Sequence, residues 1–166
     1  MPSFELVTRI AAPPGRVFDA SLDVDVHTAS MADSGERVVG GVSAGGMRLG
    51  DTVTWRARHF GVWWRMTSAI TAYDRPDFFV DEQRRGPFRR WRHEHHFAAA
   101  DATDDAPGDG TGNGGGTVMR DVVEFASPLG VLGRAVDALA LRRYMVKLIA
   151  ERNAHIKALL EAEARH

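Results

Sequence analysis

The alternation of hydrophobic and polar positions is clearest between Arg90 and Phe97, where the sequence reads RWRHEHHF. Side chains along a strand point alternately to opposite faces, so the aromatic residues at both ends of this segment predict which face is buried. On that face, His93 and His95 stand in a row between Trp91 and Phe97. Because a buried polar group without a partner is costly, this pattern indicates a strand that lines an apolar cavity containing polar groups.

Similar patterns predict the other elements. Residues 3–11 alternate as a half-buried strand does, and two prolines then lead into short helices over 16–22 and 23–34. A segment over 101–116 is rich in Gly, Asp and Thr, so we expect a flexible hairpin loop there and not a domain boundary. The remaining predicted strands cover 37–42, 51–60, 62–73, 77–84, 89–97 and 117–125.

The C-terminal segment has the hydrophobic spacing of a long amphipathic helix. Its apolar stripe after Leu141 consists of Met145, Leu148, Ile149, Ile156 and Leu159. The apolar positions before Leu141 project to the opposite side, so we predict a break or a change of packing surface near 137–140. The order of elements predicts an α+β fold in which a curved antiparallel sheet of six or seven strands wraps a long helix. A cavity would lie between sheet and helix, and 1–166 would be one domain.

Composition narrows the function classes. The chain of 166 residues is long enough for one domain with a sizeable core, and its formal net charge of −1 gives no general attraction to nucleic acid. Because there is no cysteine, disulfides, thiolate metal sites and cysteine nucleophiles are excluded. No secretory signal is visible, and no apolar run approaches the ~20 residues that a membrane span needs. We therefore expect a cytoplasmic protein that binds no nucleic acid and does not span a membrane.

The strand phases place aromatic residues, methionines and a few polar groups on the inner face of the sheet. This mixture is typical of a small-molecule pocket, although each aromatic residue taken singly is also explained as ordinary core. The predicted ligand-binding residues are Trp55, His59, Trp64, Met66, Phe79, Asp81, Gln83, Trp91, His93, His95, Met119, Asp121, Met145 and Arg152.

Asp121 is the most informative polar position, because it lies between two apolar residues of the same predicted face. A carboxylate there must be hydrogen-bonded, paired or protonated. Two partners remain open: a histidine of the preceding strand, His93 or His95, and Arg152 of the last helix. An Asp–His pair facing a pocket would serve as a general base, whereas a pair with Arg152 would clamp the helix to the sheet.

The histidines also allow a metal interpretation, in which His93 and His95 ligate zinc with Asp121 or His59 as a third ligand. The spacing is permitted but not specific, and a hydrogen-bonded pair of histidines is commoner, so we expect no metal ion and no cofactor. His27 is expected to be a surface or cap residue. The arginines over 84–92 are interpreted as a solvated hairpin tip, because Trp91 points away from its arginine neighbours.

Several segments resemble the START/SRPBCC superfamily of helix-grip proteins, and within it the polyketide cyclase/dehydrase-like proteins. The resemblance implies a helix-grip fold around an internal cavity and supplies no common metal site. The superfamily contains lipid and hormone carriers, cyclases, oxygenase subunits and stress proteins, so it does not imply one function. The similar segments are APPGRVFD (12–19), GDTVTWRARHFG (50–61), FRRWRHEHHF (88–97), MRDVVEF (119–125), PLG (128–130) and RNAHI (152–156).

Three functions follow from these observations. The first is a carrier or sensor that binds a hydrophobic or aromatic small molecule. The second is a cofactor-free polyketide cyclase or dehydratase, with Asp121 and His93 or His95 as catalytic base and Gln83 or Arg152 stabilising an enolate oxygen. The third is a protein-interaction module that uses the arginine-rich hairpin. An enclosed volume of about 300–1,000 Å³ would favour the first two, and a filled interior would favour the third.

Overall fold

The computed structural model describes residues 3–100, 116–126 and 140–165 of the chain. Within these ranges, seven strands form one antiparallel sheet in the order β1-β7-β6-β5-β4-β3-β2. The strands are β1 (Ser3–Ile10), β2 (Arg37–Gly41), β3 (Thr52–His59), β4 (Val62–Asp74), β5 (Phe78–Arg85), β6 (Arg90–Ala99) and β7 (Thr117–Ala126). The helices are α1 (Pro14–Leu22), α2 (Val24–Ser30), the 3₁₀ helix η1 (Ala32–Ser34) and α4 (Arg142–Glu163).

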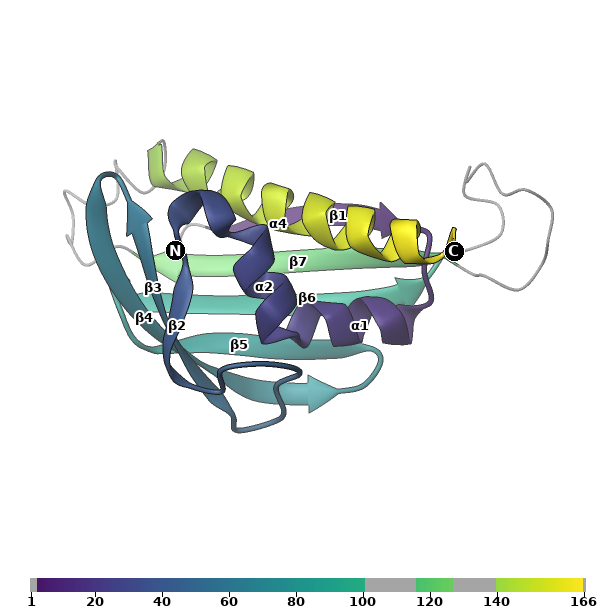
Figure 1. The fold of residues 1–166 in the computed structure, drawn as a ribbon, viewed down its shortest axis with the longest axis horizontal. Helices are drawn as coiled ribbons and strands as arrows, with labels where there is room; N and C mark the ends of the chain where they lie inside the picture. Colours follow the sequence, from purple (N-terminus) through teal and green to yellow (C-terminus); the bar gives the residue numbers. More distant parts are fainter. Residues whose placement is uncertain (1–2, 101–115, 127–139, 166) are drawn as a thin grey trace.

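The sheet is curved, and the helices lie on one of its faces (Figure 1). The long helix α4 runs along the β1 and β7 side, while α1 and α2 cover the middle of the same face. The curvature is accompanied by bulges in β4, where the register against β5 shifts between Thr67 and Ser68 and again between Ile70 and Ala72. The predicted α+β helix-grip architecture is thereby confirmed.

Local sequence explains where the short elements begin and end. Pro14 occupies the first turn of α1, where its missing N–H is not needed. The Asp23 side chain caps α2 by accepting hydrogen bonds from the backbone N–H groups of Asp25 and Val26, at 2.9 and 3.0 Å. The β3–β4 hairpin turns through Phe60 and Gly61, which both have positive φ values, 53° and 76°.

The interior has two apolar clusters. Near α1, the ring of Phe18 packs edge-on against Phe79 and Phe97, with ring centroids 5.4 Å apart in both pairs. The other cluster lies toward the N-terminal end of α4 and includes Trp91 and Met145. Between the two clusters, inward positions on β5, β6, β7 and α4 carry polar side chains. We call this the polar layer; it consists of Asp81, His93, His95, Asp121, Arg152 and Asn153.

Of the predicted hydrophobic stripe of the C-terminal helix, Met145, Ile149 and Ile156 are buried, whereas Leu148 is only partly buried. Leu160 is buried at 4% exposure, whereas Leu159 is only partly buried. The predicted change of packing surface near 137–140 and the loop 101–116 lie almost entirely outside the described residues. None of the helices in the described part of the chain has both the length and the hydropathy needed to cross a membrane.

Candidate functional site

A cavity of about 540 Å³ lies between the concave face of the sheet and helices α2 and α4. Its volume falls within the ~300–1,000 Å³ range of small-molecule sites. The walls are mostly apolar and come from β3 to β6 and from the two helices. The lining extends from exposed residues such as Phe60, which is 68% exposed, to fully buried ones such as His95. The cavity therefore leads from the molecular surface to the polar layer.

Most of the predicted ligand-binding residues border this cavity. Trp64 lies in the part of the lining near the β3–β4 hairpin and is 40% exposed. The predicted residues in the lining are Trp55, His59, Trp64, Met66, Phe79, Asp81, Trp91, His93, His95, Met145 and Arg152.

Three predicted residues do not border the cavity, each for a local reason. Gln83 folds back onto its own hairpin, where its side-chain amide donates to the backbone oxygen of Phe88 at 2.7 Å and accepts from the backbone N–H at 3.2 Å. Met119 is fully buried under α1, with its sulfur 3.7 Å from Ser21 Oγ. Asp121 is also fully buried and lies behind the two histidines.

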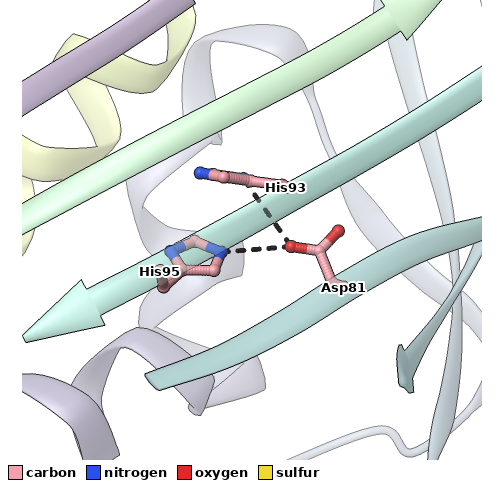
Figure 2. A group of neighbouring side chains, drawn as sticks. All are labelled: Asp81, His93 and His95. Atoms are coloured by element: carbon pink, nitrogen blue, oxygen red, sulfur yellow. Dashed lines mark hydrogen bonds and ion pairs between the residues drawn. The ribbon is translucent and has the colours of Figure 1, made fainter. Parts of the chain in front are cut away.

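His93, His95 and Asp81 converge at the buried end of the cavity (Figure 2). The two histidines project from the same face of β6, and Asp81 is paired directly with His93 across the β5–β6 ladder. Asp81 Oδ2 lies 3.1 Å from His95 Nε2 and 3.6 Å from His93 Nδ1. The imidazole centroids are 3.7 Å apart. The regular strand pairing thus holds two imidazoles against one carboxylate oxygen.

Asp121 connects this group to α4. Its Oδ1 lies 2.8 Å from His93 Nε2, and its Oδ2 accepts a hydrogen bond from Asn153 Nδ2 at 2.7 Å. Arg152 approaches Oδ1 to 3.8 Å and donates to the backbone oxygen of Ser21 at 2.9 Å. Of the two partners considered from the sequence, Asp121 therefore contacts both: histidine directly and Arg152 at longer range. Its place outside the cavity makes it a positioning group behind His93.

Burial and the neighbouring charges determine the protonation of the polar layer. Burial, reinforced by the adjacent His95, lowers the pKa of His93 to about 4, so its ring is neutral near pH 7. Burial by itself would raise the pKa values of Asp81 and Asp121, but their histidine neighbours outweigh it and lower both. Both carboxylates are therefore ionised, and Arg152 is the buried cation beside them.

At the outer part of the cavity, the β3–β4 hairpin contacts α4. His59 Nδ1 lies 2.6 Å from Tyr144 Oη, and the ring of Phe60 packs on Tyr144 with centroids 4.6 Å apart. Phe60 adopts a positive φ that is uncommon for a bulky residue, and such strain is concentrated at functional sites. This contact joins two elements that are distant in sequence across the cavity entrance.

Several lining residues were not predicted. His27, expected at the surface, borders the cavity, and its Nε2 lies 2.6 Å from Glu36 Oε1. Tyr144 also borders the cavity, and Asn153 anchors Asp121 from outside it. Helical spacing would have identified Asn153, because it follows Ile149 by four positions on the buried stripe. No pattern in the sequence relates His27 to Glu36, because their contact depends on how α2 packs on the sheet.

No family model matches the chain, and no curated protein matches it. Solved structures match over nearly its full length. The protein TTHA0849 from Thermus thermophilus has a TM-score of 0.72 and 16% identity, covering 98% of this chain and 99% of that one. A START superfamily protein from Mycobacterium smegmatis has a TM-score of 0.66 and 10% identity, covering 96% and 97% of the two chains.

Protein Ms6760 from Mycobacterium smegmatis is also similar, with a TM-score of 0.66 and 21% identity over 97% of this chain and 92% of that one. Sequence identities this low show a shared fold but do not show a shared function. The resemblance seen in the sequence is confirmed at the level of the fold. The chain shares the fold of these proteins, a long helix held against a curved antiparallel sheet, and one of them is described as a START superfamily protein.

Proposed function

We propose that this protein binds a hydrophobic or aromatic small molecule in its internal cavity, with a polar group of that molecule beside Asp81, His93 and His95. The observation that carries the proposal is the cavity itself, about 540 Å³ with mostly apolar walls and polar groups gathered at its buried end. An apolar ligand gains from leaving water in such a site, and a few convergent polar groups fix its orientation.

The chemistry at the buried end indicates what the polar group of the ligand must do. The ionised carboxylate of Asp81 accepts hydrogen bonds, and the side chain keeps about a fifth of its surface exposed, 21%, so it is open to the cavity. Arg152 also borders the cavity, but it donates to Ser21 and faces Asp121. A ligand with a hydroxyl or amine donor at one end therefore fits better than one with a carboxylate.

A second candidate is an acid–base enzyme of the cyclase or dehydratase type. One observation favours it: His93 is held by the carboxylate of Asp121 at 2.8 Å while its ring borders the cavity. A neutral imidazole held by a carboxylate at one ring nitrogen has its other ring nitrogen available to accept a proton from a bound substrate. In that case His93 is the base and Asp121 positions it, since Asp121 lies behind the ring. The third candidate, an interaction module, would be favoured by a filled interior, which the cavity does not provide.

The proposal is tested by binding the fluorescent probe 1-anilinonaphthalene-8-sulfonate to the purified protein. We expect saturable binding of one probe per chain. Ala57 is buried at 5% exposure and borders the cavity, so Ala57→Phe fills part of the space and should weaken binding at least tenfold. The matched control is Ala99→Phe at an exposed strand position outside the lining, which should bind as the wild type does.

Circular dichroism first establishes that both variants are folded. Equal affinity of the folded Ala57→Phe variant and the wild type would reject the cavity as the binding site. Native mass spectrometry of the purified protein separately identifies any ligand retained from the cell. If such a ligand is recovered chemically changed after incubation with the protein, the enzyme candidate replaces the carrier.

A further inference from the structure

We propose that Asp81, His93 and His95 form a site for one divalent transition-metal ion such as Zn²⁺, with an open coordination position toward the cavity. The sequence favoured no metal, because the spacing of the two histidines is not specific by itself. Asp81 was not among the third ligands considered there; the strand register places it opposite His93. This inference does not depend on the proposed binding of a hydrophobic molecule.

The spacing of the three potential ligand atoms matches a metal site. His93 Nδ1 and His95 Nε2 both face Asp81 Oδ2, at 3.6 and 3.1 Å (Figure 2). The three residues each offer one ligand atom within 4.8 Å of the others. A tetrahedral Zn²⁺ ion with bonds of ~2.0–2.1 Å holds its ligands about 3.3 Å apart. Two imidazoles and one carboxylate with a vacant position are also the donors that non-haem metal enzymes use.

In both imidazoles, the ring nitrogen that points away from Asp81 faces the carboxylate of Asp121. A histidine that binds a metal through one ring nitrogen almost always directs the other nitrogen at a carboxylate or carbonyl. His93 Nε2 and His95 Nδ1 lie 2.8 and 2.9 Å from a single oxygen, Asp121 Oδ1. Asp121 is in turn fixed by Asn153 at 2.7 Å. One buried carboxylate therefore lies behind both potential ligands and orients His93 through a hydrogen bond.

An unpartnered atom gives independent support. His95 Nδ1 is buried and has no hydrogen-bond partner, since Asp121 Oδ1 is close to it but lies out of line with the ring. A buried polar atom of this kind is rare and needs an explanation. If His95 Nε2 binds a cation, the ring proton must reside on Nδ1, 2.9 Å from Asp121 Oδ1. A small rotation of the ring then completes a charge-assisted hydrogen bond.

The charges around the site also favour a cation. Two carboxyl groups, Asp81 and Asp121, face the two imidazoles, and one guanidinium, Arg152, accompanies them in the polar layer. Arg152 lies on the Asp121 side of the layer, at 3.8 Å from Oδ1. Arg152 therefore accompanies Asp121, and the carboxyl group of Asp81 has no cationic side chain of Lys or Arg paired with it among the described residues. A divalent ion beside Asp81 compensates the negative charge of this carboxyl group.

The test uses the full-length protein, stripped of metal with a chelator and then freed of the chelator. Isothermal titration with ZnCl₂ should show one ion bound per chain. Asp81→Asn should weaken binding at least a hundredfold, and Asp121→Asn should weaken it ten- to a hundredfold through the loss of ligand orientation. The matched control is Glu36→Gln, which removes another cavity-lining carboxylate paired with a histidine and should bind as the wild type does.

Nuclear magnetic resonance of the wild-type imidazoles gives a second readout that does not depend on how the variants fold. Zn²⁺ should shift the ring nitrogen signals of His93 and His95 and leave those of His96 and His155 in place. The inference is overturned if no stoichiometric binding occurs, if folded Asp81→Asn binds as tightly as the wild type, or if Zn²⁺ shifts other histidines instead.

Discussion

Replacing Asp121 by asparagine tests whether the polar layer holds the fold together. The carboxylate is fully buried and accepts from both sides, at 2.8 Å from His93 Nε2 and 2.7 Å from Asn153 Nδ2. An amide has only one acceptor oxygen, so its NH₂ group must face one of these donors. The change also leaves Arg152 without its nearer carboxylate. Breaking a buried charge pair from one side costs about 3–5 kcal/mol.

For a chain of this length, that loss corresponds to a fall in Tm of about 6–20 °C, at roughly 2–4 °C per kcal/mol. Urea and thermal unfolding followed by circular dichroism measure it. The matched control is Glu124→Gln on the same strand, whose partner Arg90 lies 3.5 Å away in a partly exposed ion pair. This control should lose at most about 1 kcal/mol. A loss below about 1 kcal/mol for Asp121→Asn as well would refute the assigned role of the polar layer.

Three further predictions concern the entrance and the helix. Tyr144→Phe removes the contact with His59 at 2.6 Å, so dissociation of the anilinonaphthalene probe in stopped-flow experiments should become several-fold faster. An unchanged rate would contradict a role for this contact in retaining the probe. Burial lowers the pKa of His59 below 6.5, so its NMR titration should be displaced to lower pH. Since the unfolded chain then binds more protons, the stability contributed by the neutral ring should be lost as pH falls below about 6.5; a normal titration would disprove this. Leu160→Ala should cost about 2–5 kcal/mol in urea unfolding and Leu159→Ala distinctly less, because only Leu160 is fully packed; equal losses would contradict that packing.

The sequence predicted the fold well because its strongest patterns are local. In β6, the alternation of Trp91, His93 and His95 with polar residues defines the buried face, and those three side chains are buried at 7%, 4% and 1% exposure. The order of strands and helices then leaves few alternatives to a sheet wrapped around the last helix. The sequence shows which residues of β6 face inward, because aromatic residues mark one face of the strand and charged residues mark the other.

The sequence was less informative where the strands are irregular. Two bulges shift the register of β4 against β5, so simple alternation does not fix how the side chain of Gln83 is placed. The side chain of Gln83 donates a hydrogen bond to the backbone of Phe88 in the same hairpin, a contact that the alternation of residues cannot reveal. Whether an inward-facing residue borders the cavity or lies behind the residues that do depends on tertiary packing, which alternation along a strand does not reveal. Asp121 and Asp81 are both inward-facing, yet only Asp81 borders the cavity.

Contacts between elements that are distant in the sequence could not be predicted from it. The pairs His59–Tyr144 and His27–Glu36 each depend on how a helix docks on the sheet. Neither pair has a spacing that would identify it, because one is separated by 85 positions and the other spans a turn and a 3₁₀ helix. Arg152 was identified because a charge inside an apolar stripe is conspicuous, whereas the smaller Asn153 beside it was not.

The four tryptophans provide the most direct test of the cavity as the binding site. Trp55, Trp64 and Trp91 border the cavity, whereas Trp63, on the opposite face of β4, does not and lies under the guanidinium of Arg56 at 4.5 Å. An NMR titration of the indole N–H signals with the anilinonaphthalene probe should shift the first three and leave Trp63 unchanged. A shift confined to Trp63, or no shift at saturating probe, would contradict binding inside the cavity.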